Sequence, residues 1–188
     1  MPTNSTRGGY TVPGLDQEAA GALVASLQER LTALTDLHLT LKHVHWNVVG
    51  PHFIAVHEML DPQVDAVRDM TDDIAERIAT LGGSPVGTIG AMVKARTWED
   101  YSIGRDVTTA HLGALDLVYQ GVISDHRTAI EAAETDPVTE DMLIAQSAQL
   151  ELFHWFVRAH LESASGELVT EGATSEKAAA DAAREDDH

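Results

Sequence analysis

The segment from residue 53 to residue 81 carries two parallel stripes of side chains that fit a long helix. The first stripe is apolar and repeats every three or four residues, as expected for a helix face that packs into a core. Its members are Phe53, Val56, Leu60, Val64, Val67, Ile74, Ile78 and Leu81. The second stripe lies beside the first and contains the ionisable residues His57, Asp61, Asp65, Arg68, Asp72 and Glu76. Because such groups normally stay in water unless they are paired or bind a metal, this border is a candidate metal site.

Spacing divides the candidate ligands of the second stripe into two pairs. His57 and Asp61 are one helical turn apart, and so are Asp72 and Glu76. Asp61 and Asp72 are eleven residues apart, which is about 16 Å along a helix, so one helix cannot bring both pairs to one ion. A single centre that uses both pairs requires two antiparallel copies of the helix across a two-fold axis. Mixed imidazole and carboxylate ligands suit iron, manganese or zinc.

Other interpretations of these motifs stay open. A row of acidic and basic residues at four-residue spacing is also typical of a solvated, salt-bridged helix face. The run His57-Glu58-x-x-Asp61 is a variant of the zinc-protease signature, but it lacks the second histidine of that motif. Glu151-x-x-His154 matches the ligand motif of di-iron bundles, but no second copy exists, so we interpret it as coincidental.

The remaining sequence predicts three further long helices. The first begins at Asp16, a plausible N-cap, and ends at residue 47 before Gly50-Pro51. Residues 84–103 form a connection too long for a hairpin turn, and a short helix is expected at 89–95. Long helices are then expected at 105–133 and 138–165. Four amphipathic helices with one long connection predict an all-α, ferritin-like four-helix bundle.

Composition limits the partners and the location of the chain. The net charge of -18 attracts cations and repels nucleic acid. The absence of cysteine excludes disulfides and thiolate metal sites and fits a reducing cytoplasm. With no apolar run long enough for a membrane span and no signal-peptide core, we expect a cytoplasmic protein without a membrane partner. Three regions are expected: a flexible arm at 1–14, the bundle at 15–165 and an acidic, alanine-rich tail at 166–188, in which 176–184 could form a short helix.

The runs LKHVHWNVVGPHFIAVHEMLD and DDIAERIATLGG resemble the Dps family (DNA-binding protein from starved cells), a ferritin-like family. The likeness covers about residues 15–165 and is greatest to actinobacterial members, through DLHLTLKHVHWNVVGP, DPQV and WFVRAHLES. It implies a hollow homododecamer with ferroxidase centres at its two-fold interfaces. Each centre would take His45, His57 and Asp61 from one subunit and Asp72 and Glu76 from its neighbour. Trp46 would lie beside the centre and intercept oxidising equivalents.

The resemblance also implies a function. Such a shell would oxidise ferrous iron, preferentially with hydrogen peroxide, at a centre holding one or two iron ions, store ferric mineral, and so protect DNA from oxidative damage. Ferrous iron would enter through acidic pores, for which Asp141 is the best match and Glu134 a weaker one. Acidic residues around a helix start are equally explained by the helix dipole.

The tail bears on whether the protein binds DNA. Residues 167–188 contain seven acidic residues against Lys177 and Arg184, so a basic arm of the kind that binds phosphate is missing. We therefore expect weak or absent DNA binding. The alternative is a structural, nucleoid-compacting shell with little ferroxidase activity. Its metal site would hold zinc or be vestigial, and the shell would be located at the nucleoid.

Overall fold

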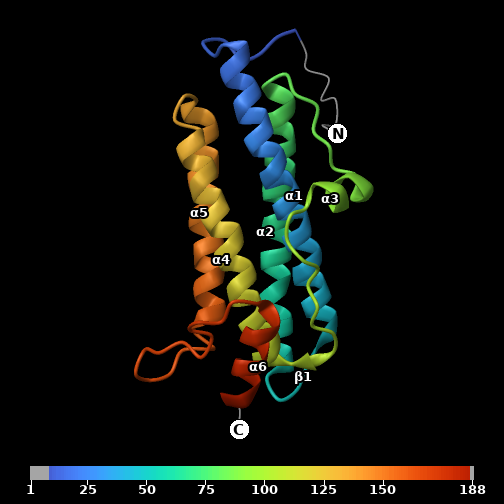
Figure 1. The fold of residues 1–188 in the computed structure, drawn as a ribbon, viewed down its shortest axis with the longest axis vertical. Helices are drawn as coiled ribbons and strands as arrows, with labels where there is room; N and C mark the ends of the chain where they lie inside the picture. The colour runs from blue at the N-terminus through green and yellow to red at the C-terminus, as the bar shows by residue number, and fades with distance from the viewer. Residues whose placement is uncertain (1–8, 187–188) are drawn as a thin grey trace.

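The computed structural model describes residues 9–186, so residues 1–8 of the expected N-terminal arm lie outside the described chain. Four long helices form an elongated bundle (Figure 1). They are α1 (Gln17–Asn47), α2 (Phe53–Thr80), α4 (Thr108–Ala132) and α5 (Pro137–Arg158). The smaller elements are β1 (Val48–Val49), α3 (Ile89–Ala95), β2 (Asp106–Val107) and α6 (Glu176–Asp186). The predicted all-α, ferritin-like architecture with a short helix between the second and third long helices is confirmed.

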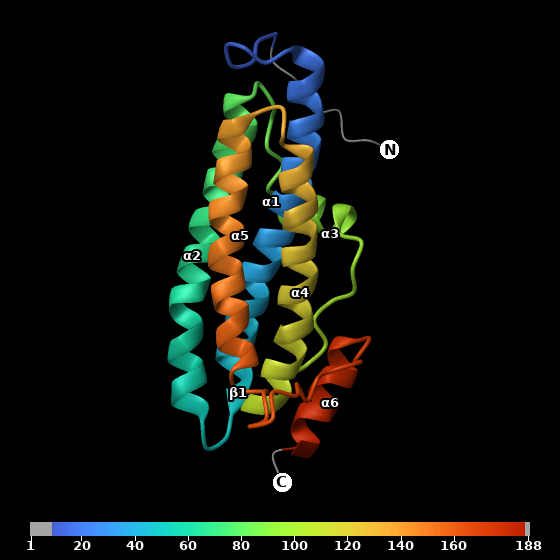
Figure 2. The same ribbon diagram turned by 90° about the vertical axis from the view of Figure 1, so that its left-hand side faces the viewer.

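The path of the chain explains the long connection. The hairpin α1–α2 packs against the hairpin α4–α5, and the segment carrying α3 returns along α1 to the other end of the bundle before α4 begins (Figure 2). There β2 pairs in parallel with β1, with Val48 opposite Asp106 and Val49 opposite Val107. This short pairing, which the sequence did not predict, fixes the end of the connection to the α1–α2 turn.

Helix boundaries agree with expectation where a local signal sets them. The Asp16 carboxylate accepts hydrogen bonds from the amides of Glu18 and Ala19 at 2.9 and 2.8 Å, which confirms it as the N-cap of α1. The expected end of the last bundle helix at residue 165 is wrong, because α5 stops at Arg158 and turns at residues 159–161. Proline 62 lies inside α2 without ending it.

The apolar stripe of α2 forms part of the bundle core, with one correction. Val56, Leu60, Val67, Ile74 and Ile78 are fully buried. Phe53 is 37% exposed, because it occupies the first position of α2 at the end of the bundle. Its ring lies 4.9 Å from that of His57 and so covers a candidate ligand instead of filling the core.

The C-terminal segment folds back onto the bundle. Ala179, Ala180 and Ala183 of α6 are buried against α4 (Figure 2). The absent side chain of Gly113 permits this approach, because a Cβ there would lie 2.5 Å from the Ala179 carbonyl oxygen. Within residues 9–186, the helices are all too short or too polar to cross a membrane.

Candidate metal centre

Three of the expected ligands come together where α1 ends and α2 begins. His45 lies in the last turn of α1, and His57 and Asp61 lie in the first turns of α2. One potential ligand atom from each of these residues lies within 4.8 Å of the other two. In the part of the chain that the structure describes, this is the only such group of three or more histidine or acidic side chains.

The two imidazoles are oriented by reciprocal hydrogen bonds. His45 Nδ1 donates to the His57 carbonyl at 3.1 Å, and His57 Nδ1 donates to the His45 carbonyl at 3.0 Å. A carbonyl only accepts, so each Nδ1 carries a proton, which leaves Nε2 as the nitrogen with a lone pair in the neutral ring. The rings stack with centroids 3.6 Å apart. Backbone carbonyls that fix a histidine tautomer in this way are typical of metal-ligating histidines.

Asp61 is held by a cation that the sequence analysis did not assign to the site. Lys42 Nζ donates to Asp61 Oδ1 at 3.1 Å, and His45 Nδ1 lies 3.2 Å from the same oxygen. The hydrogen bond from Lys42 lowers the pKa of the Asp61 carboxyl below its usual value, and the neighbouring His45 adds to this effect. Lys42 precedes His45 by three residues and therefore shares its side of α1, which is the signal that could have identified it.

Trp46 extends into solvent next to this group. It is 70% exposed in the single chain. Lys42 Nζ lies 5.9 Å from the centre of the indole ring, within the range of a cation–π contact. The indole is thus connected to Asp61 through one lysine side chain.

Asp72 and Glu76 do not join the group. Both are exposed side chains farther along α2, and eleven residues of helix separate Asp72 from Asp61, about 16 Å. One chain therefore supplies two imidazoles and one carboxylate, with Asp61 about half exposed. Such a set leaves coordination positions open on a transition-metal ion.

The other expected and alternative residues are separated from this group. Asp141 and Glu134 are exposed near the α4–α5 turn. Asp136 between them is buried, and it binds the side chains of Arg77 and Thr139. Glu151 pairs with Arg127 and His154 with Asp116. Those two residues of the Glu-x-x-His motif thus have separate structural partners, as expected for a coincidental match.

The chain was compared with known proteins. Residues 24–166 match the ferritin-like domain family. The chain is 61% identical over 176 residues to the DNA protection during starvation protein of Mycolicibacterium smegmatis, covering 93% of this chain and 96% of the relative. Among solved structures, Mycobacterium smegmatis Dps superposes with a TM-score of 0.87 at 60% identity, covering 89% of this chain and 97% of that one. DpsA14 from Streptomyces coelicolor superposes with a TM-score of 0.85 at 66% identity, covering 87% and 98%.

Proposed function

Because the chain belongs to the Dps family of ferritin-like proteins, we propose that it oxidises ferrous iron, stores the ferric product and thereby protects DNA. The observation that carries the proposal is the convergence of His45, His57 and Asp61, with the two imidazoles oriented by reciprocal hydrogen bonds to backbone carbonyls. A structural surface would have no need to fix two stacked imidazoles by reciprocal carbonyl bonds.

The proposed centre is completed by a second subunit. Asp72 and Glu76 are solvent-exposed in the single chain and lie at the spacing that an antiparallel copy of α2 would bring opposite the other ligands. Large apolar side chains are exposed around the same end of α1 and on α3: Leu39, Trp46, Ile89 and Val93. An apolar surface next to an incomplete ligand set supports a homo-oligomer, and a closed dodecameric shell is the assembly we propose.

Iron is the substrate and cargo of this centre. Each hydrogen peroxide molecule takes two electrons, one from each of two ferrous ions, and leaves as two waters after taking up two protons. The imidazoles fix the position of the iron, and the carboxylates balance its charge. Trp46 is close enough to the group to act as a sink for stray oxidising equivalents. Asp141 and Glu134 are the proposed lining of the entry pores, with Asp141 the stronger candidate.

DNA compaction is not supported by the charge of the chain. The proposed shell would carry -18 per subunit, and within α6 the side chain of Glu185 is exposed and that of Asp181 is partly exposed. A gel-shift titration of the purified shell at physiological salt and neutral pH should give no retarded DNA. Stable complexes under those conditions would favour the nucleoid-compacting alternative.

Stopped-flow absorbance tests the ferroxidase proposal. The protein is loaded anaerobically with ferrous iron and mixed with peroxide, and ferric formation is followed. The double variant His57→Ala/Asp61→Ala should reduce the rate to that of buffer while the shell remains assembled in gel filtration. The matched control Asp65→Ala removes an acidic residue one turn farther along the same stripe and should keep the wild-type rate. Equal rates for wild type and the double variant would refute the assignment.

Complementation between subunits tests the shared site. Shells of His57→Ala/Asp61→Ala alone, or of Asp72→Ala/Glu76→Ala alone, should both be inactive. When the two variants are co-expressed, each mixed interface contains one site with all ligands intact, so about a quarter of all sites should recover. If the mixed shells stay inactive, His57/Asp61 and Asp72/Glu76 do not belong to one shared centre.

A further inference from the structure

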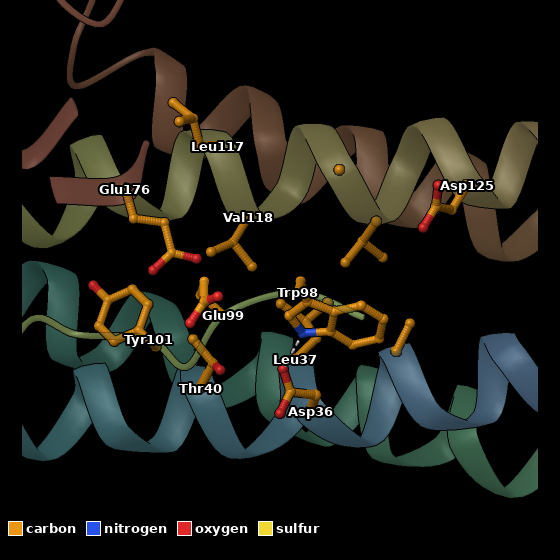
Figure 3. A pocket seen from close by; sticks show the side chains of 13 residues that line it. Asp36, Leu37, Thr40, Trp98, Glu99, Tyr101, Leu117, Val118, Asp125 and Glu176 are labelled. Carbon is orange, nitrogen blue, oxygen red and sulfur yellow. Dashed lines mark hydrogen bonds between the residues drawn. The ribbon is translucent and has the colours of Figure 1, made fainter. Parts of the chain in front are cut away.

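A small cavity lies between α1, α4 and the segment 98–101, and none of the candidate metal ligands lines it (Figure 3). Its volume is about 180 Å³, below the roughly 300 Å³ at which pockets for drug-sized ligands begin. The side chains of Leu37, Val118, Trp98 and Tyr101 form apolar and aromatic walls. The N-terminal residue of α6, Glu176, reaches into the cavity from the C-terminal segment.

The polar groups of the cavity are predominantly anionic, and two of them are unpaired. Asp36 accepts hydrogen bonds from Arg96 at 3.1 Å and from the Trp98 indole at 2.7 Å, so its charge is compensated. Glu176 and Glu99 make neither a hydrogen bond nor an ion pair with any residue between 9 and 186 whose side chain is described. Burial and the charge of Asp36 raise the pKa of Glu176, and the nearby charge of Arg96 offsets only part of this effect.

A hydroxyl group of a mostly buried residue also faces this space. Thr40 is only 8% exposed, and it lines the cavity from α1 (Figure 3). Other threonines of the same helix, Thr32 and Thr35, donate to the carbonyl four residues earlier. The Thr40 hydroxyl makes no such bond, and its oxygen is not among the fully buried side-chain atoms that lack a partner, so it is accessible from the cavity. The Thr40 oxygen is therefore available to a hydrogen-bonding group that enters the cavity.

The arrangement discriminates between kinds of cation. The acidic side chains around the cavity do not bring three ligand atoms within 4.8 Å of one another, so they do not form a metal-binding group. Apolar walls instead suit a hydrocarbon chain, and aromatic walls suit a cation over the ring face. Carboxylates that lie apart suit positive charges at the two ends of such a chain. We propose that this cavity binds a short aliphatic amine, with an ammonium group on Glu176 and Thr40 and the chain between Trp98, Tyr101 and Val118.

Isothermal titration of the assembled protein with putrescine tests the proposal. Putrescine should bind with one site per subunit, 1,4-butanediol of the same chain length should not bind, and Mg²⁺ should compete poorly. Glu176→Gln should weaken putrescine binding roughly tenfold, the loss expected for one charge-assisted hydrogen bond. The matched control is Glu171→Gln, an exposed acidic residue of the same C-terminal segment outside the cavity, and its affinity should stay within about twofold of wild type.

A second variant separates binding from folding. Thr40→Val keeps the shape of the side chain and removes the hydroxyl, so it should weaken putrescine several-fold without lowering the thermal midpoint. Equal affinities of wild type and Glu176→Gln would overturn the proposal. So would equal losses in Glu176→Gln and Glu171→Gln, because putrescine would then be sensing only the net negative charge. Competition by Mg²⁺ as strong as binding of putrescine would assign the cavity to metal ions instead.

Discussion

Replacing Asp116 by asparagine should destabilise the subunit more than any conservative change on its surface. Asp116 is 3% exposed in α4, and its carboxylate accepts three hydrogen bonds from separate parts of the chain. His154 Nε2 and Arg158 Nε of α5 donate to Oδ1 at 2.6 and 2.8 Å, and Thr170 Oγ1 donates to Oδ2 at 2.6 Å. One carboxylate therefore connects α4 to α5 and to the start of the C-terminal segment.

The magnitude follows from the charge of the acceptor. Hydrogen bonds to an ionised group contribute about 1 kcal/mol more than neutral ones, and three such bonds change in Asp116→Asn, so the loss should be about 3 kcal/mol. For a chain of this length that corresponds to roughly 6–12 °C in thermal midpoint. Differential scanning calorimetry at equal protein concentration measures it, because the stability of an oligomer depends on concentration. Glu131→Gln, an exposed residue of the same helix, is the control and should change stability by less than about 0.5 kcal/mol.

The pH dependence provides the refutation. Burial alone would raise the pKa of Asp116, but the hydrogen bonds from His154, Arg158 and Thr170 hold it well below its ordinary value of 3.8. A lowered folded-state pKa contributes stability above pH 3.8, and this contribution is lost as the pH falls further through the folded-state pKa. The difference in unfolding free energy between wild type and Asp116→Asn should therefore become smaller below about pH 4. A midpoint change under 2 °C at neutral pH, about 1 kcal/mol or less, would show that the network does not stabilise the fold.

Three further predictions concern other sites. Gly113→Ala should detach α6 and raise the rate at which α6 is cleaved by a protease, because the new Cβ would meet the Ala179 carbonyl. Gly121→Ala in the same helix is the control, because a Cβ there meets open space and should leave the cleavage rate unchanged. Equal cleavage rates in the two variants would contradict the packing of α6 on Gly113. Lys42→Met should bind Co²⁺ more tightly by visible absorption titration, because the lysine competes for Asp61; weaker binding would mean that Lys42 assists the metal. Burial lowers the pKa of His126 to about 4. As the pH falls from 6.5 to 4, the free energy of unfolding of wild type should therefore drop by about 3 kcal/mol more than that of His126→Gln, as measured by urea unfolding. Identical pH profiles of unfolding free energy in the two proteins would exclude the effect.

The sequence by itself determined the helices and the ligand candidates. Periodicity over residues 53–81 and the N-cap Asp16 are local features, and they predicted α2 and the start of α1 closely. The eleven-residue gap between Asp61 and Asp72 predicted that a single chain holds only part of a centre. Among residues 9–186, His45, His57 and Asp61 converge without Asp72 and Glu76, and a centre completed by a second subunit stays a prediction.

Tertiary structure decided what depends on contacts between distant segments. No local pattern predicted the pairing of Val48 with Asp106, since a two-residue parallel strand pair has no period of its own. Lys42 reaches Asp61 of the candidate metal centre only because α1 packs on α2. Thr40 and Glu176 are far apart in the chain, and only the docking of α6 on α4 brings them to one cavity. Local patterns fix which face of a helix is buried, whereas the partners on that face are set by packing.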